Sequence, residues 1–256
     1  MLTLIKQELY KLLHKNGTYI GLACIFCFQI ALAILSKVFP GFMSADAAFG
    51  TGFAGSSITV FVMIAATASI IAMEFQYGTV RQLLYRKYYR SQVFISKIIV
   101  VILHALVLYV LQFVMALLLK FALFPSIDLG ASAGHGRTVL SALAISNVAD
   151  FISLLLLLSV VLLLSTLFKS NAAAITSGYI GYFVMSMASS LLMLLISHWE
   201  WVKWNPFTMM LLGNQILNPA MSSVTHLSTP IMFWGSIAYT VVFSFLAYAL
   251  FRKRSV

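Results

Sequence analysis

The chain has 256 residues, of which 62% are hydrophobic and 9% charged, whereas about 25% of a typical soluble domain is charged. This composition, with a mean hydropathy of +1.01, excludes a soluble globular domain and predicts an all-α polytopic membrane protein. The formal net charge is +10. Because the basic residues stand beside hydrophobic runs, we read this charge as a signal of membrane orientation and expect no binding to nucleic acid.

Residues 1–17 are expected to form an amphipathic elbow helix that lies at the membrane interface and leads into the first span. Leu2, Ile5, Leu9 and Leu12 recur at helical spacing, with lysines elsewhere around the helix. Basic residues, an apolar run and the triplet Ala31–Ala33 also resemble a cleaved secretory signal. However, the apolar run begins only after these 17 residues, so we expect the helix to be uncleaved.

Six stretches are apolar and long enough to cross the ~30 Å hydrocarbon layer as helices, which takes roughly 20 residues each. Together they predict one transmembrane domain over residues 1–256. The third is longer than a span requires, which favours a tilt or a projection beyond the bilayer. The expected spans are 18–39, 54–73, 93–121, 148–168, 172–197 and 230–251.

The distribution of Lys and Arg predicts a plasma-membrane protein with both termini in the cytoplasm, because these residues are retained on the cytoplasmic side. With that orientation only Lys37, Lys120, Arg137 and Lys203 lie outside. The bases on the inside are Lys6, Lys11, Lys15, Arg81, Arg86, Lys87, Arg90, Lys97, Lys169, Arg252, Lys253 and Arg254.

The two longer outer loops differ in composition. Residues 122–147 are rich in Gly, Ser and Ala, and we expect them to be irregular or partly helical. Residues 198–229 carry Trp199, Trp201 and Trp204, which are typical of an aromatic belt at the outer interface. The apolar stretch 207–217 is too short to span, so we expect a re-entrant or interfacial helix pair there.

Several motifs with known chemistry are absent or out of context. The "GTGFAG" at Gly50–Gly55 matches a dinucleotide-binding pattern, but it precedes a span instead of following a strand. The cysteines Cys24 and Cys27 form a CxxC without a second pair or nearby histidines, so packed or lipid-facing thiols are favoured over zinc binding. No phosphate-binding loop GxxxxGK[ST] occurs. We expect no cofactor or metal on this chain and no enzymatic activity.

A few polar residues interrupt the predicted spans, and polar residues inside a membrane are candidates for a translocation path. Asp150 is expected at the outer boundary of the fourth span, where solvation or helix capping would also explain it. Interhelical hydrogen bonding is the simpler explanation for the two glutamines. The candidates are Gln29, His104, Gln112 and Asp150.

The fifth span carries two pairs of small residues at four-residue spacing, Ala174 with Gly178 and Ser177 with Gly181. Such pairs allow close approach of helices in membranes. The spacing leaves open whether that contact lies within one chain or between two.

The segment Glu74–Lys97 concentrates charge between two apolar runs, with one acid and five bases among its 24 residues. Apolar residues recur at helical spacing after Gly78, where we expect a turn, and tyrosines alternate with the bases. This order predicts a short helix along the cytoplasmic surface, although a solvated basic loop that only sets the topology is the alternative.

The pattern Glu74, Gly78–Thr79, Leu83–Leu84, Arg90 and Lys97 resembles the cytoplasmic signature of type-2 ABC exporter permeases. The resemblance implies a coupling helix between spans two and three that docks on a separate ATPase subunit. Its expected coupling residues are Glu74, Gly78, Thr79, Arg81, Leu83, Leu84, Arg86, Arg90 and Lys97. One departure concerns the end of this helix: the family usually has a Pro shortly before the Arg, whereas this chain has "YRKYYR".

The resemblance implies a permease subunit that works as a dimer with an identical or homologous permease and two ABC ATPase subunits, which bind ATP and Mg. It implies export of amphipathic or hydrophobic cargo, with antimicrobial peptides, and resistance to them, favoured. Efflux of sodium or of multiple drugs is an alternative to peptide export. Two alternatives come from other functional classes: a substrate-binding membrane subunit for vitamin uptake, and an intramembrane enzyme. Such an enzyme would use paired intramembrane acids, and the predicted spans contain none.

Overall fold

The computed structural model describes residues 1–41, 43–78, 88–133, 136–196 and 198–253. Within these residues, six helices are long and apolar enough to cross a membrane, so the chain is a multi-pass membrane protein. They are α2 (Asn16–Val38), α4 (Gly55–Gln76), α6 (Arg90–Leu123), α7 (Val139–Ser165), α8 (Asn171–Ile196) and α12 (Thr229–Lys253).

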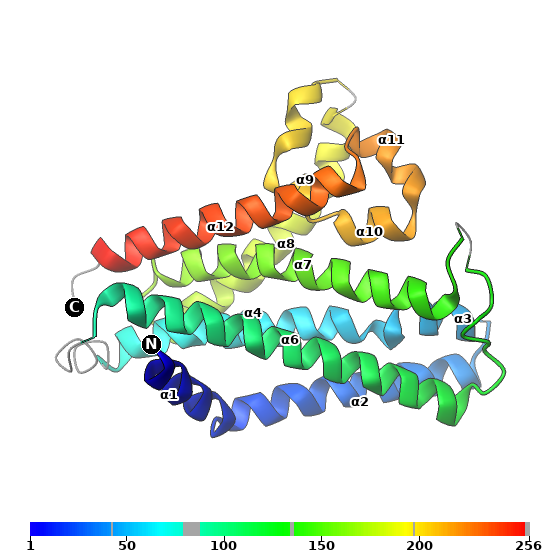
Figure 1. Cartoon of the computed structure of the whole chain (residues 1–256), viewed down its shortest axis with the longest axis horizontal. Coiled ribbons are helices and arrows are strands. Elements are labelled where there is room, and N and C mark those ends of the chain that lie inside the picture. The colour runs from blue at the N-terminus through cyan, green and yellow to red at the C-terminus, as the bar shows by residue number, and fades with distance from the viewer. Residues whose placement is uncertain (42, 79–87, 134–135, 197, 254–256) are drawn as a thin grey trace.

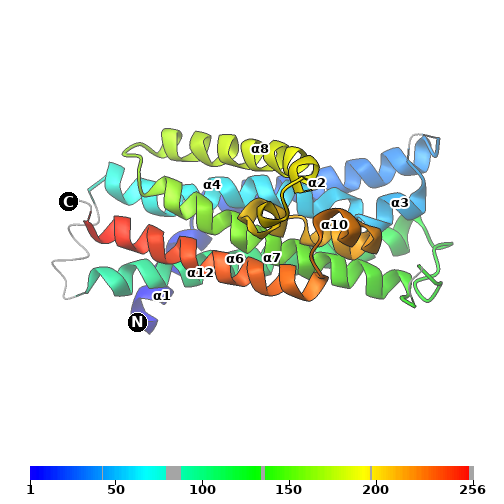
Figure 2. The same cartoon turned by 90° about the horizontal axis from the view of Figure 1, so that it is seen from above.

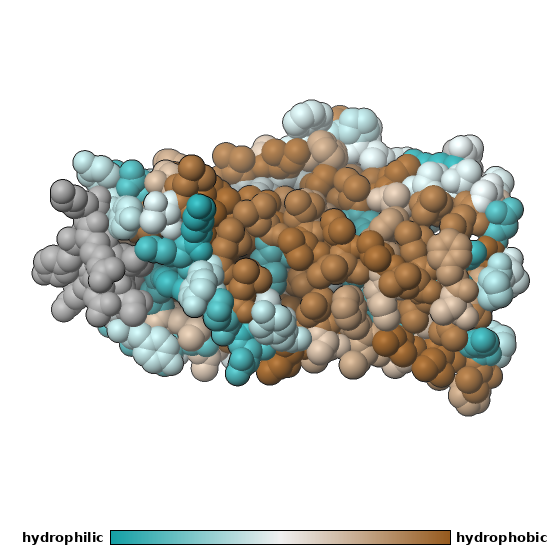
Figure 3. Space-filling model, turned by 60° about the horizontal axis from the view of Figure 1, so that its bottom comes forward, coloured by the Kyte–Doolittle hydropathy of each residue, from teal (hydrophilic) through white to brown (hydrophobic). Residues whose placement is uncertain are grey.

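The six long helices run side by side as one bundle, with α4 and α7 in its centre (Figures 1 and 2). Helix α7 packs against α12, α4 and α8, and α4 packs against α2, α6 and α8. The N-terminus and the end of α12 lie at the same end of the bundle, here called the terminal end (Figure 1). Hydrophobic side chains form a wide band across the middle of the surface, and hydrophilic ones gather at the terminal end (Figure 3). This division matches a bundle whose middle is surrounded by lipid.

A separate short helix, α1 (Leu2–Leu13), precedes the first span and packs against α6. It ends four residues before the expected limit at residue 17, because α2 already begins at Asn16. Leu4 and Glu8, one turn apart, face the bundle and are buried, whereas Leu2 of the apolar stripe is 77% exposed. The side of α1 that carries Leu4 and Glu8 therefore packs on the bundle, and the side that carries Leu2 is turned away from it.

The fourth span begins earlier than the sequence indicated. Helix α7 starts at Val139, not at residue 148, because Thr138 caps it by accepting a hydrogen bond from the backbone N–H of Ser141. The end of the loop 122–147 is therefore helical. Asp150, expected at the boundary of the span, lies in the twelfth position of the helix instead.

Two groups of short helices lie away from the terminal end, one at the opposite end of the bundle and one along its side next to α8 and α12 (Figure 1). The first is α3 (Ala45–Gly50) and the 3₁₀ helix η1 (Gly52–Ala54), and the second follows α8. Residues 207–217, where a helix pair was expected, form α9 (Pro206–Met209) and α10 (Leu212–Leu217); α10 packs on α7, and α9 on α8 and α12. The remaining elements are η2 (Glu200–Trp204), η3 (Pro219–Met221) and α11 (Ser222–Thr225).

The small residues of α8 face the inside of this chain. A Cβ added at Gly178 would stand 2.7 Å from Cγ2 of Ile64 in α4, and one at Gly181 would stand 3.2 Å from Cδ1 of Leu164 in α7. Ala174 is fully buried. The close helix contact predicted from these residues is therefore intramolecular. The opposite side of α8 is apolar and exposed, as at Phe183 and Leu191.

Candidate functional site

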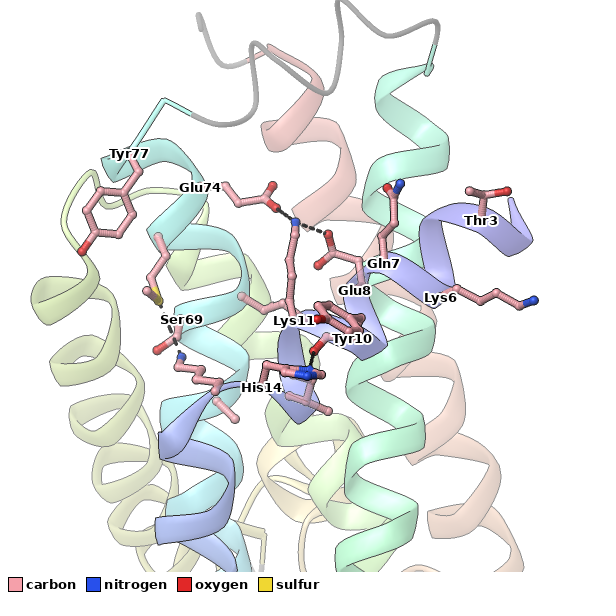
Figure 4. A pocket seen from close by; sticks show the side chains of 15 residues that line it. Thr3, Lys6, Gln7, Glu8, Tyr10, Lys11, His14, Ser69, Glu74 and Tyr77 are labelled. Carbon is pink, nitrogen blue, oxygen red and sulfur yellow. Dashed lines mark hydrogen bonds and ion pairs between the residues drawn. The ribbon is translucent and has the colours of Figure 1, made fainter.

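A cluster of four charged side chains joins three helices at the terminal end; three of them are buried, and the fourth, Lys11, is half-exposed. Lys97 of α6 donates to Glu74 of α4 at 2.7 Å and to Glu8 of α1 at 2.9 Å. Lys11 of α1 donates to the same two carboxylates, at 3.2 Å to Glu74 and 2.8 Å to Glu8. Figure 4 shows the Lys11 side chain reaching between the two glutamates. Two bases thus bridge two acids in a closed, charge-balanced arrangement.

Helix geometry explains how these residues meet. Glu74 lies in the last turn of α4, and Lys97 lies in the second turn of α6, so both are near the terminal end of the bundle. Glu8 and Lys11 are three residues apart on α1 and therefore share one face of that helix. Because α1 packs on α6, this face is directed toward both other residues.

Burial makes the ion pairs strong and hard to separate. The side chain of Lys97 is 1% exposed, and those of Glu8 and Glu74 are 5% and 10% exposed. Although burial by itself raises the pKa of Glu8, its ion pairs with Lys97 and Lys11 hold that pKa below the ordinary value. Burial likewise lowers the pKa of Lys11, but its bonds to Glu8 and Glu74 raise it above the ordinary value overall. Separating one partner from such a pair typically costs about 3–5 kcal/mol.

The cluster contains the first and last residues of the segment that carries the family resemblance. Glu74 and Lys97, 23 positions apart in the chain, are in direct contact. Their side chains are buried, so they hold the two ends of the segment together and do not offer a docking surface themselves. The expected coupling residues Thr79, Arg81, Leu83, Leu84 and Arg86 lie outside the described residues.

The other two expected coupling residues have structural roles at the ends of helices. Gly78 has a φ of +67° and follows the last residues of α4, which is the turn expected from the sequence and a conformation that favours glycine. Arg90 begins α6, and its guanidinium donates to the backbone carbonyl of Arg252 in the last turn of α12 at 2.6 Å. The start of α6 is therefore fastened to α12 as well as to α1.

Sequence reasoning missed Glu8 entirely. The signal was present, because the protein has only six acidic residues and Glu8 lies one helical turn after Leu4 on the face that turns out to be buried. A carboxylate at an apolar position of an amphipathic helix indicates a buried base as its partner. Nothing local identifies that base as Lys97, which is 89 residues away in the chain.

Three of the four polar residues expected to line a path come together near the start of α4. The Gln29 amide donates to the carbonyls of Gly52 and Gln112, and the Gln112 amide donates to Asn147 at 3.3 Å. Asp150, one turn after Asn147, accepts a hydrogen bond from Ser56 of α4. Asn147 and Ser56 were not predicted.

The polar group around Gln112 is connected to a tightly packed turn. A Cβ added at Gly55 would lie 2.2 Å from Oε1 of Gln112 and 2.5 Å from Nε2 of Gln29, so a larger residue there would displace both glutamine side chains. His104 does not join this group: it lies two helical turns away on α6, and its buried Nε2 has no hydrogen-bond partner in the described part of the chain. The four candidates therefore do not form one continuous line.

Comparisons with known proteins give a family and two relatives. The model of the family described as "Protein of unknown function (DUF2705)" matches residues 20–256. The chain is 26% identical over 255 residues to "Uncharacterized membrane protein YdbK" of Bacillus subtilis, a match that covers 96% of this chain and 99% of the relative. It is 25% identical over 209 residues to "Uncharacterized protein YhcI" of the same organism, covering 78% of this chain and 65% of that protein.

Proposed function

Since the chain belongs to the family described as "Protein of unknown function (DUF2705)", we propose its function from its own residues: it is the membrane-spanning permease subunit of an exporter driven by separate ATP-binding cassette ATPase subunits. The sequence contains no phosphate-binding loop, so in this proposal ATP and Mg bind to the partner and the chain itself is not an enzyme. The resemblance of Glu74–Lys97 to the coupling signature of such permeases supports this function.

The ion-pair cluster is the observation that carries the proposal. It ties both ends of the segment Glu74–Lys97 to each other and to α1 through contacts of 2.7–2.9 Å around Lys97. A segment that receives force from a partner protein must be fastened to the bundle, because otherwise its displacement would be absorbed locally. Buried ion pairs provide such a fastening, since separating them leaves uncompensated charge in a medium of low dielectric constant.

The mechanism follows from this fastening. Closure of the ATPase pair displaces the segment, and the ends of α4 and α6 move with it. Helix α1 follows through Glu8, and α12 follows through the bond between Arg90 and the carbonyl of Arg252. Because α4 lies in the centre of the bundle, packed on α2, α6, α7 and α8, its displacement reaches all of the neighbouring spans.

The orientation and the cargo are part of the same proposal. The excess of Lys and Arg at the terminal end supports a cytoplasmic position for both termini. The buried residues described here are mostly apolar, and polar ones such as Gln29, His104 and Gln112 are scattered among them. This favours amphipathic or hydrophobic cargo such as an antimicrobial peptide over small ions. A second permease subunit completes the translocation path.

The decisive experiment is co-purification with an ABC ATPase encoded beside this chain, using Leu84→Asp to place a charge in the segment. The matched control is Leu217→Asp, at an exposed leucine (54%) that ends α10, away from the terminal end. We expect L84D to lose the ATPase and transport, and L217D to retain both. Both variants should melt at the wild-type temperature in detergent without the ATPase.

Two outcomes would contradict the proposal. If L84D retains the ATPase and its stimulation as the wild type does, the segment is not the coupling element. If no ATPase associates with the wild-type chain, and a ligand instead co-purifies with single chains, the protein acts as a binding subunit and not as an exporter.

A further inference from the structure

A cavity of about 970 Å³ opens between α1 and α4, next to the ion-pair cluster at the terminal end (Figure 4). One side is made by polar and basic residues of α1 and the α1–α2 junction, including Lys6, Lys11 and Lys15. The other side is made by α4, where Ala66, Ile70 and Met73 line the wall. The cavity thus has a cationic side and an apolar side, and no step of the proposed coupling mechanism uses it.

The charges around the cavity do not balance. Glu8 and Glu74 are each paired with both Lys11 and Lys97, so the acids and bases of the cluster neutralise one another. Lys6 and Lys15 remain, and no carboxylate lies within ion-pair distance of either among the described residues. The cavity therefore carries an excess of positive charge.

Lys15 is the unusual member of this pair because it is only partly exposed. Its ammonium group contacts Sδ of Met73 at 3.5 Å, and a thioether is a weak acceptor that cannot replace water or an anion. Burial without a counter-charge lowers the pKa of Lys15. An anion bound beside this ammonium group would relieve the cost of burying it.

The position of the cavity indicates which anion fits. Lys15 immediately precedes the first residue of α2, the first span, so its ammonium group lies where the hydrocarbon layer meets the headgroups. Basic residues at this level attract anionic lipids of the membrane surface. The apolar wall from Ala66 to Met73 is suited to the first methylenes of an acyl chain, whereas a free phosphate ion would leave that wall in contact with water only.

We propose that this cavity binds one anionic phospholipid, with its phosphate against Lys15 and an acyl chain along Ala66 and Ile70 of α4. The lipid connects α1 to α4 on the side opposite to α6 and so completes the packing of α1. This inference does not depend on the export function, because it rests on the cavity, its charges and its depth in the membrane.

The test uses the full-length protein, delipidated in an uncharged detergent. Phosphatidylglycerol, phosphatidylcholine and soluble glycerol 3-phosphate are added separately, and native mass spectrometry counts the bound molecules while thermal melting reports stabilisation. We expect saturable binding of one phosphatidylglycerol with a rise in melting temperature, weak binding of phosphatidylcholine, and none of glycerol 3-phosphate.

Two variants and one control locate the site. Lys15→Gln should weaken phosphatidylglycerol binding about five-fold, the usual contribution of one basic residue at an anionic membrane surface. Ala66→Phe places a ring in the apolar side of the cavity and should also weaken it. Lys37→Gln is the control: Lys37 is exposed and lies in the last turn of α2, at the opposite end of the bundle from Lys15. This variant should bind phosphatidylglycerol like the wild type.

Three results would overturn the assignment. Equal affinity for phosphatidylcholine would remove the role of the anionic headgroup. Glycerol 3-phosphate binding as tightly as the lipid would make the site one for a soluble phosphate. Unchanged phosphatidylglycerol binding in both K15Q and A66F would mean that the lipid binds elsewhere. If K15Q does not fold, unchanged binding in A66F alone is enough to overturn the assignment.

Discussion

Replacing Lys97 by Met tests the strength of the ion-pair cluster most directly. Methionine has a similar length and no charge, so it leaves Glu8 and Glu74 buried with only Lys11 to compensate them. The Lys97 side chain is 1% exposed and contacts both carboxylates. Removing one partner from a buried pair typically costs about 3–5 kcal/mol. We expect K97M to lower the free energy of unfolding by that amount.

The assay is reversible unfolding in mixed micelles by titration with a denaturing detergent, followed by circular dichroism. Lys203→Met is the matched control: its ammonium group lies 3.6 Å from Glu200, which is 76% exposed. An exposed pair contributes about 0–1 kcal/mol. The double variant Glu8→Gln with Lys97→Met should lose less than the sum of the two single changes, since each single change leaves a charge unpaired.

A loss of less than about 1 kcal/mol in K97M would refute the reasoning. It would mean that water or a rearranged Lys11 satisfies the two glutamates, and that α1, α4 and α6 are not rigidly joined. The proposed transmission of force through this cluster would then lose its physical basis, even if the ATPase still binds the segment.

Two further predictions concern acid stability and backbone strain. The folded-state pKa of Glu8 lies below its ordinary value of 4.5, so its contribution to stability is present above pH 4.5 and is lost as the pH falls through the lowered value. Glu8→Gln should therefore reduce the drop in melting temperature that acid causes. An unchanged drop in this variant would contradict the ion pairing of Glu8. Ala54 has a left-handed conformation with φ 54° and ψ 24°, which costs a non-glycine residue about 1–2 kcal/mol. Ala54→Gly should therefore raise the free energy of unfolding by about 0.5–1 kcal/mol after the entropy of glycine is subtracted. The control Ala47→Gly, at an exposed position of the regular helix α3, should lower the free energy of unfolding. A loss of stability in A54G would show that the turn is not strained.

The left-handed turn at Gly52–Ala54 could not be predicted from the sequence motif that contains it. The sequence "GTGFAG" indicated only a turn before the second span. In the structure three consecutive residues, Gly52, Phe53 and Ala54, have positive φ. Phe53 is fully buried and stacks on Phe124 with 5.8 Å between ring centres. Burial of this ring holds the backbone in a conformation that its own residues disfavour, and local propensity does not reveal that compensation.

The sequence determined the architecture because a membrane leaves few choices. A backbone in lipid must satisfy its hydrogen bonds within each segment, so apolar length alone identified six helices, and all six are present. It also drew attention to Glu74 and Lys97, as the two ends of the segment that resembles a coupling signature. The sequence around Glu74 and around Lys97 does not indicate that the two side chains are in contact.

Tertiary structure decided how those residues are used. The pairing of Lys97 with Glu8 joins positions 89 residues apart, and the gathering of Gln29, Gln112 and Asn147 depends on which faces three different helices turn inward. In an almost uniformly apolar span, hydropathy has no strong period, so the sequence indicates that a helix crosses the membrane but not which side of it meets its neighbours. Packing and the few buried polar contacts make that choice.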